Sequence, residues 1–285
     1  MTTTRLYGEK ISRRFVIITP VLNGEKYLAD ALASIDAQSH RDWIHYVVDG
    51  GSSDSTLEIV QRSMQAEPRR RLIQGSDRGL YDALFKGFAA AYSEGSADDD
   101  VYCWLNADDR LAPWAFATMT LAFDTDGGEW ITGQPGRWDG EGRLILVEPN
   151  GWYPRRFIAG GWFNFNCLGS IQQESTFFTA RILRKLSPQA VANIRGTRLA
   201  GDFLLWREFA RLSALRVLPT VVGGFRLHGA NLSTKSMDAY VKELRANGAV
   251  MLPSTVAKCC RLFYQIVAAI VASLKTRRPV GAAKK

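Results

Sequence analysis

The chain has 285 residues, of which 46% are hydrophobic, 22% charged and 11% aromatic. This suffices for one large core or two modest ones, and glycine (25) and proline (10) are too sparse for a fibrous or low-complexity protein. The net charge is +8, and all of it lies in residues 235–285, which hold ten basic and two acidic side chains. Because residues 1–234 are neutral, the chain lacks the basic body typical of a nucleic-acid enzyme, and we expect a globular domain with a cationic appendage.

Strand and helix signals alternate over the first 125 residues. Short apolar runs predict buried strands, and apolar residues at helical spacing predict the helices between them. The expected strands are 15–18, 43–48, 71–73 and 101–105, and the expected helices begin at 24, after 52–54, at 80 and at 114. This alternation predicts a mostly parallel sheet with right-handed crossovers, and hence an α/β fold.

The pattern changes after Glu129, where glycines break the chain into short segments rich in aromatic residues. Two interpretations of these aromatic side chains remain open. They form the core of a β-hairpin, or they form a wall that packs on the apolar face of a sugar. The aromatic residues concerned are Trp138, Trp152, Tyr153, Phe157, Trp162, Phe163 and Phe165.

Three expected strands end in polar clusters. Thr19-Pro20 with Asn23 follows the first strand, Asp49 to Asp54 follows the second, and Asn106-Ala107-Asp108-Asp109 follows the fourth. Parallel strands bring such ends to one edge of the sheet, where ligands bind in open α/β folds. Adjacent carboxylates at a strand end suit a hard divalent cation that also binds substrate phosphates, although acidic turns also begin ordinary helices.

Two common phosphate-binding motifs are missing from the sequence. The first strand is not followed by GxGxxG, and no GxxxxGK[ST] segment occurs. A cation held by Asp109 is therefore the expected means of neutralising phosphate charge.

Six segments in order resemble the family 2 glycosyltransferases over residues 14–233. They are Thr-Pro-Val-Leu-Asn-Gly, Val-Val-Asp-Gly-Gly-Ser-Ser-Asp, Ser-Asp-Arg-Gly-Leu-Tyr-Asp-Ala, Leu-Asn-Ala-Asp-Asp, Gln-Gln-Glu-Ser-Thr and Gly-Asp-Phe-Leu-Leu-Trp. The resemblance implies a single nucleotide-sugar-binding domain of the GT-A type. It implies transfer of a sugar from a nucleoside diphosphate, most commonly of uridine, to an acceptor hydroxyl with inversion.

The resemblance also implies donor-binding residues. Thr19 and Pro20 would line the base pocket, and Asp49 would contact the nucleobase. Many relatives have a second Asp after this position, where Gly50 stands here. Asp77 would lie near the nucleoside and sugar.

The strand-end motif has further implied roles. Asp108 would face the ribose, and Asp109 would bind Mg²⁺ or Mn²⁺. Asn106 stands where relatives often have Asp and would lie near the donor.

On the acceptor side, the resemblance implies that Gln173 and Glu174 enter the sugar pocket and that Asp202 is the general base. An alternative for Asp202 is a helix N-cap. His228 would close over the diphosphate and bind the metal or a phosphate oxygen.

The predicted organisation is an N-terminal extension (1–13), a GT-A domain (14–233) and a basic helical tail (234–285). The domain would divide into a nucleotide-binding half (14–125) and an acceptor half (126–233). Without a signal peptide in residues 1–11, and with no CxxC pair among four cysteines, a cytoplasmic location with reduced thiols is expected.

The tail holds an apolar segment of 13 residues, 262–274, flanked by basic residues. It is too short to span a bilayer, so we expect an interfacial helix on an anionic membrane, or a helix that packs on the body. The expected acceptor is a sugar or lipid-linked sugar of bacterial surface polysaccharide or glycolipid assembly. Alternatives are a nucleotide-sugar-binding protein without transfer activity and a basic nucleic-acid-binding protein, the latter disfavoured by the neutral body.

Overall fold

The computed structural model describes residues 13–149, 151–229, 231 and 236–276. The predicted N-terminal extension and the basic end of the tail therefore lie almost wholly outside the described residues. The four predicted strands are confirmed. They are β1 (Phe15–Val21), β2 (Trp43–Asp49), β3 (Arg70–Gln74) and β4 (Val101–Trp104).

These strands form the parallel half of one mixed sheet in the order β3-β2-β1-β4-β8-β6-β9-β5. The second half contains β5 (Arg110–Leu111), β6 (Trp130–Trp138), β8 (Thr176–Thr179) and β9 (Arg216–Arg226), and the edge strand β7 (Leu144–Val147) pairs with β6. β8 runs antiparallel to both β4 and β6, which restores the parallel direction in β6 and β9. The expected mostly parallel sheet is thus confirmed, with β5, β7 and β8 as antiparallel members.

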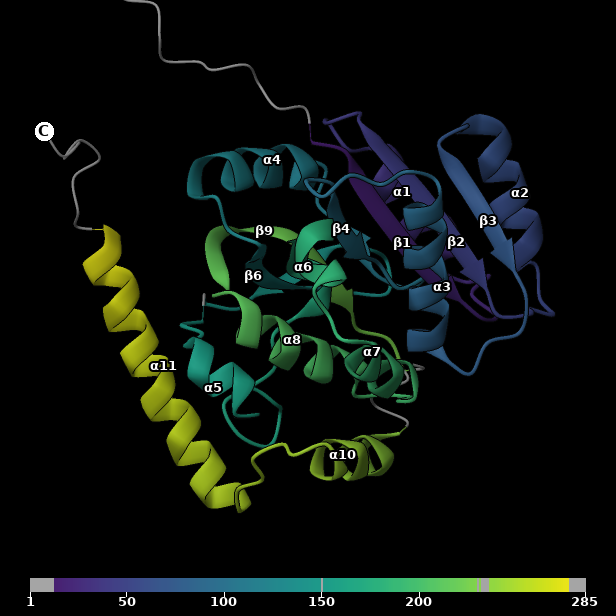
Figure 1. Ribbon diagram of the computed structural model, residues 1–285. Coiled ribbons are helices and arrows are strands. Elements are labelled where there is room, and N and C mark those ends of the chain that lie inside the picture. The colour runs from purple at the N-terminus through teal and green to yellow at the C-terminus, as the bar shows by residue number, and fades with distance from the viewer. Residues whose placement is uncertain (1–12, 150, 230, 232–235, 277–285) are drawn as a thin grey trace, which may run out of the picture.

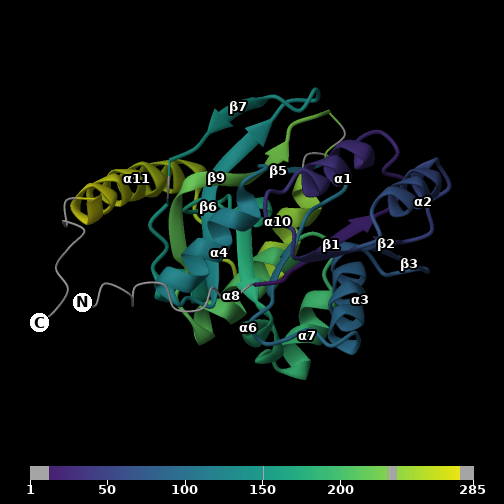
Figure 2. The same cartoon turned by 90° about the horizontal axis from the view of Figure 1, so that it is seen from above.

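Helices cover both faces of this sheet. One face carries α1 (Leu28–Asp36), α2 (Thr56–Ala66) and α4 (Ala115–Asp126). The other carries α3 (Leu80–Ser93), α6 (Ala180–Arg184), α7 (Pro188–Arg195) and α8 (Gly201–Leu212). Figure 2 shows α1 and α2 on one side of β1, β2 and β3, and α3 on the opposite side.

β1 is apolar from Phe15 to Ile18 because neighbouring side chains pack on opposite faces of the sheet. Val16 and Ile18 pack against the α3 and α8 side, whereas Phe15 and Ile17 pack against α1 and α4. A strand covered on both faces has no polar positions to alternate with. The apolar run of β1 therefore reflects burial of the strand on both faces of the sheet.

The aromatic segment after β7 packs against α8 and against helices near the C-terminus. It contains α5 (Arg155–Ala159) and leads to a short 3₁₀ turn at Gln173–Ser175. The Tyr153 ring lies 4.9 Å from Phe163, which in turn lies 5.5 Å from Tyr264. β7 itself is exposed. The aromatic hairpin core is therefore found only in part, and the sugar-facing wall stays a prediction.

The tail forms two helices, α10 (Met237–Ala246) and α11 (Ser254–Thr276). α11 has 23 residues, so the helix is longer than the 13-residue apolar segment suggested; in length and composition its residues 254–271 could cross a membrane. One side of it packs on the body through Ala257, Tyr264 and Ala268. Figure 1 shows α11 along the edge of the molecule opposite α2.

Candidate functional site

The ends of β1 and β2 lie side by side, as the sequence predicted, and β4, the third strand of that prediction, pairs with β1 on its other side. Val21 is in register with Asp49, and Ile18 with Trp104. The two loops that follow β1 and β2 are linked by short hydrogen bonds. The Asn23 backbone N–H donates to Ser52 Oγ, and the Ser53 N–H donates to Asn23 Oδ1, both at 2.8 Å. These hydrogen bonds thus hold the loops after β1 and β2 together at the strand ends.

The Asp49 carboxylate accepts hydrogen bonds from the turn that follows it. The side chain is 1% exposed, and Oδ2 accepts backbone N–H groups of Gly51 at 3.0 Å and Ser52 at 3.1 Å. A carboxylate that accepts two backbone N–H groups fixes loop geometry. The expected base contact therefore has little carboxylate surface to offer a ligand.

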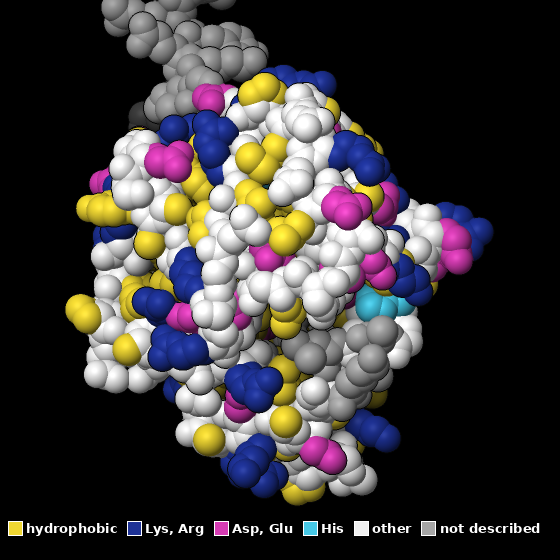
Figure 3. Space-filling model, turned by 90° about the vertical axis from the view of Figure 1, so that its right-hand side faces the viewer, with side chains coloured by type: hydrophobic (Ala, Val, Ile, Leu, Met, Phe, Trp, Pro, Cys, Tyr) yellow, Lys and Arg dark blue, Asp and Glu magenta, His cyan; other side chains and the backbone are white. Residues whose placement is uncertain are grey.

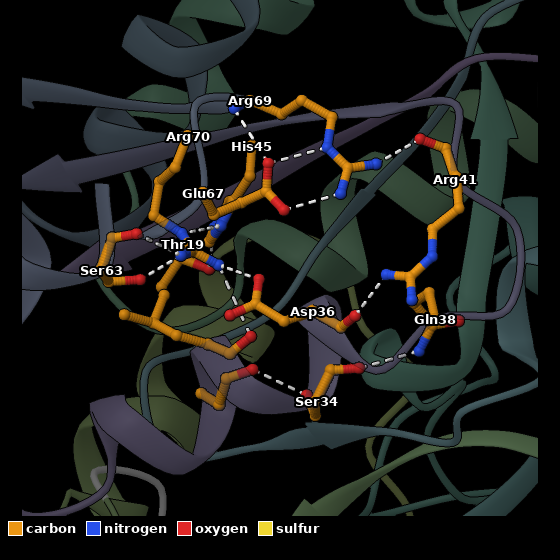
Figure 4. Close-up of polar contacts among 12 residues, drawn as sticks. Thr19, Ser34, Asp36, Gln38, Arg41, His45, Ser63, Glu67, Arg69 and Arg70 are labelled. Carbon is orange, nitrogen blue, oxygen red and sulfur yellow. Dashed lines mark hydrogen bonds and ion pairs between the residues drawn. The ribbon is translucent and has the colours of Figure 1, made fainter. Parts of the chain in front are cut away.

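Thr19 is also withdrawn from the surface, although Pro20 remains beside it at the end of β1. The Thr19 hydroxyl lies 2.9 Å from His45 Nε2, and Arg70 Nε donates to His45 Nδ1 at 3.1 Å. Because Nδ1 is the acceptor, His45 carries its proton on Nε2 and donates to Thr19. Burial, and then the Arg70 charge, hold the pKa of His45 well below its ordinary value. Figure 4 shows this network, which Asp36 completes with an ion pair to Arg70 at 2.7 Å. The Thr19 hydroxyl is therefore engaged within the protein, and its role in a base pocket stays a prediction.

The Asp77 carboxylate lies beside Gly50. A Cβ added to Gly50 would lie 2.7 Å from Asp77 Oδ2, so an aspartate at position 50 would collide with this carboxylate. Asp77 Oδ1 accepts the Gly79 N–H at 2.9 Å, and no described residue donates to Oδ2. Asp77 thus places a carboxylate oxygen where the sequence lacks a second acid after Asp49.

The two acids after β4 have different surroundings. Asp109 is fully buried; its Oδ1 accepts the Arg226 backbone N–H at 2.8 Å, and its Oδ2 accepts from Asn106 Nδ2 at 3.0 Å. Asp108 is part-exposed, and its Oδ2 lies 2.8 Å from His228 Nε2. Figure 3, drawn from the side of the molecule that carries α2, shows acidic side chains and a histidine at the surface.

Asp109 and Glu174 form a carboxyl pair. Burial, then the charges of Glu174 and Asp108, raise the pKa of Asp109 well above its ordinary value. Burial raises the pKa of Glu174 to about 7, and its hydrogen bond with Asp109 opposes that rise. Burial therefore disfavours the ionised form of both carboxyl groups. Gln173 Nε2 donates to Glu174 Oε1 at 2.6 Å, which orients the Glu174 carboxyl group.

Asp202 lies in the first turn of α8, and Ala200 occupies the N-cap position. The N-cap alternative for Asp202 is therefore wrong. Asp202 Oδ1 accepts the Phe203 N–H at 2.7 Å and the Tyr81 hydroxyl at 3.2 Å. Burial raises the pKa of Asp202 to about 6, against these two hydrogen bonds, which lower it. A Cβ at Gly201 would overlap the Tyr81 ring, so glycine is what lets this tyrosine reach Asp202.

The sequence predicted Asp109 and His228 as metal ligands, and in the structure Asp108 is the acid that is part-exposed and lies beside His228. The described residues contain no group of three or more His, Cys, Asp or Glu placed to hold a metal. Mg²⁺ bound with substrate phosphates needs only one or two protein ligands, which one carboxylate and one imidazole supply. Asp109 is shielded from solvent with both oxygens hydrogen-bonded. Asn106 Oδ1, buried without a partner among the described residues, adds one unused acceptor at this strand end.

Arg226 is the residue that sequence inspection missed. It is buried at the end of β9, donates from Nε to the Asp108 carbonyl at 2.6 Å and pairs with Asp30 of α1. Its guanidinium also lies over the Tyr27 ring, which packs 4.6 Å from the His228 ring. The only sequence signal was its position two residues before His228. Tyr81 was also missed, because its partner Asp202 lies far along the chain.

Comparison with known proteins gives a consistent family and fold. The family model for glycosyl transferase family 2 matches residues 16–183. The O-antigen biosynthesis protein RfbC of Myxococcus xanthus is 34% identical over 119 residues, which cover 40% of this chain and 9% of that protein. The matched segments span between 9% and 36% of the curated relatives.

Two solved structures share the fold. S. aureus TarS (1–349) in complex with UDP-GlcNAc superposes with a TM-score of 0.60 at 14% identity, covering 94% of this chain and 76% of that one. The Pyrobaculum calidifontis mannosyltransferase PcManGT in complex with GDP-Man and Mn²⁺ gives a TM-score of 0.58 at 15% identity, with coverages of 93% and 76%. The expected GT-A fold is confirmed.

Proposed function

The chain belongs to glycosyl transferase family 2, and on that premise we propose that it moves a sugar from a nucleoside diphosphate sugar to an acceptor hydroxyl. The observation that carries this proposal is the presence of two kinds of group around the buried Glu174, which interacts with Asp109 and with the charge of Asp202. Asp108 with His228 suits the diphosphate side of the reaction, and Asp202 with Tyr81 suits the acceptor side. A uridine diphosphate sugar is the proposed donor, in keeping with the UDP-GlcNAc named for TarS.

Asp108 and His228 are the residues that would hold Mg²⁺ or Mn²⁺. The bound cation would stabilise the negative charge that develops on the departing diphosphate. Arg226 positions both residues, since it binds the Asp108 carbonyl and its chain leads directly into His228. Asp77 Oδ2 is the proposed acceptor for the nucleobase or ribose, and Pro20 lies at the neighbouring strand end.

Asp202 is the proposed general base. The acceptor oxygen attacks the anomeric carbon while the bond from that carbon to the diphosphate oxygen breaks, and the acceptor proton passes to Asp202. A single displacement of this kind inverts the anomeric configuration. Tyr81 holds one carboxylate oxygen, which leaves Oδ2 for the acceptor.

Glu174 and Gln173 would border the sugar pocket between these two sides. The Asp109 and Glu174 carboxyl groups are both buried beside this pocket. The proposed setting is bacterial surface polysaccharide or glycolipid assembly at the cytoplasmic membrane face, in line with the O-antigen role named for RfbC.

The decisive experiment is a transfer assay with a panel of nucleotide sugars, preceded by thermal-shift screening of each donor with Mn²⁺. We expect one donor to raise the melting temperature and to be consumed when acceptor is added. Stabilisation without consumption of any donor, with a range of sugar and lipid-linked acceptors, would favour a binding protein. Absence of both effects for every nucleotide sugar would refute the proposal.

A further inference from the structure

A groove lies where α10 and α11 meet, away from the crevice at the strand ends. It encloses about 630 Å³. Apolar side chains that include Val241, Leu252 and Ala257 form part of its wall. Three cations, Arg245, Lys258 and Arg261, also line it, and no acidic residue does. The groove therefore joins an apolar lining to concentrated positive charge.

The positive charge of this groove is not neutralised within the described structure. Arg261 donates from its guanidinium to the backbone carbonyls of Phe165 and Cys167, which fix its position but carry no net charge. Arg245 and Lys258 are exposed and form no ion pair with a described residue. Such a group of cations favours a ligand that carries one or two negative charges, as phosphate and diphosphate do.

The outer side of α11 continues from the groove as an apolar stripe. Phe263 is 69% exposed, Ile266 52% and Ile270 54%, at the 3–4 residue spacing of one helix face. The opposite face of the helix packs on the body. In Figure 1 the start of α11 lies next to the loop from α10, and the helix then runs along the outside of the molecule. A ligand with an anionic head and an apolar chain matches both features.

α10 separates this groove from Asp202. Val241 and Arg245, one turn apart, line the groove, whereas Leu244 is buried with Phe203 of α8. Tyr240 stacks on Phe165 with ring centroids 5.2 Å apart, and the charge of Asp202 helps to raise the pKa of Tyr240, which places the two side chains near one another. The groove and the proposed base thus lie on different sides of α10.

We propose that this groove binds the phosphate or diphosphate of a lipid-linked acceptor, with the lipid chain along α11 and the sugar directed toward Asp202. Arg245, Lys258 and Arg261 pair with the phosphate oxygens. This assignment rests on the proposed transferase function for the role of the ligand, but not for its binding.

The test measures binding to the full-length protein without donor or metal, so transfer activity does not enter it. Binding is measured by calorimetry with three probes: farnesyl diphosphate, farnesol and inorganic pyrophosphate. The test variant is Arg245→Gln with Lys258→Gln. The matched control is Arg62→Gln with Lys242→Gln, which removes two exposed charges outside the groove.

Farnesyl diphosphate should bind the wild type more tightly than either other probe. The groove variant should weaken that binding about tenfold or more, as expected for two charge-assisted contacts, while the control variant does not. Pyrophosphate binding equal to farnesyl diphosphate binding would reduce the groove to a simple anion site and overturn the proposal. Equal losses in the test and control variants, or equal binding of farnesol, would also overturn it.

The two proposals fail in distinguishable ways. If no nucleotide sugar binds but the groove variant has lower affinity for farnesyl diphosphate, the lipid-phosphate site is supported and the transferase function is not. If transfer to a soluble sugar proceeds and farnesyl diphosphate does not bind, the transferase stands and the groove assignment falls.

Discussion

Asp108 Oδ2 lies 2.8 Å from His228 Nε2, although the two residues are 120 positions apart in the chain. Asp109, its neighbour in sequence, is turned into the interior and is held by the backbone of Arg226 and by Asn106. The adjacent carboxylates therefore differ in exposure, since Asp108 is part-exposed and Asp109 is buried.

Asp108→Asn should remove metal-dependent donor binding and lower kcat/KM by on the order of 10²–10³-fold, as for loss of one group that stabilises charge in the transition state. Asp109→Asn should be milder, because Asp109 is buried and an amide oxygen can still accept the Arg226 N–H. Donor binding titrated against Mn²⁺ compares the two variants. If Asp108→Asn kept near wild-type activity and folded Asp109→Asn had none, Asp109 rather than Asp108 would be the metal ligand.

Asp202→Asn should lower turnover about 10²–10⁴-fold while donor affinity is kept, because the base acts only on the acceptor. The wild type should lose activity as pH falls through about 6, since Asp202 must be ionised to accept a proton and its pKa is raised to about 6. The variant should lack this acidic limb. Equal loss of donor affinity and turnover would make Asp202 a structural residue.

Tyr81→Phe removes a hydrogen bond that lowers the pKa of Asp202. The pKa of Asp202 should rise further, so the acidic limb of the rate profile should move to higher pH. The pH profile of kcat/KM distinguishes this positioning role from simple destabilisation, which changes the amount of active protein but not the position of the limb. An unmoved limb would exclude the role.

His45 makes the fold sensitive to acid. Because its pKa in the folded state is well below the ordinary 6.5, only the unfolded chain takes up this proton as pH falls below about 6.5. The free energy of unfolding should therefore decrease by about 1.4 kcal/mol per pH unit from this group. His45→Gln should remove that slope in urea unfolding measured between pH 7 and pH 5. The control His40→Gln, outside the network, should keep it.

The exposed side of α11 should bind anionic membranes. Phe263→Glu with Ile266→Glu places charge on the apolar stripe and should abolish co-sedimentation with phosphatidylglycerol vesicles. Leu121→Glu, at a position that is also 69% exposed but lies on α4, is the matched control and should sediment like the wild type. Unchanged sedimentation of the α11 variant would exclude this surface.

The sequence by itself determined the elements of the nucleotide-binding half. Burial on both faces makes β1, β2 and β4 rich in apolar residues, and the helices between them need one apolar face each, so both signals are local. The convergence of the strand ends followed from parallel connectivity alone.

Only the tertiary structure decided which polar residues face the crevice. The sequence cannot show which of Asp108 and Asp109 is exposed, because side-chain direction in a loop depends on distant partners. For the same reason it cannot show that Thr19 and Asp49 form hydrogen bonds within the protein. Arg226 from β9, Tyr81 beneath Asp202 and His45 beneath Thr19 are such partners, and each lies far along the chain from the residue it positions. Local pattern fixes where a strand ends; long-range hydrogen bonding and burial fix which of its carboxylates can meet a ligand.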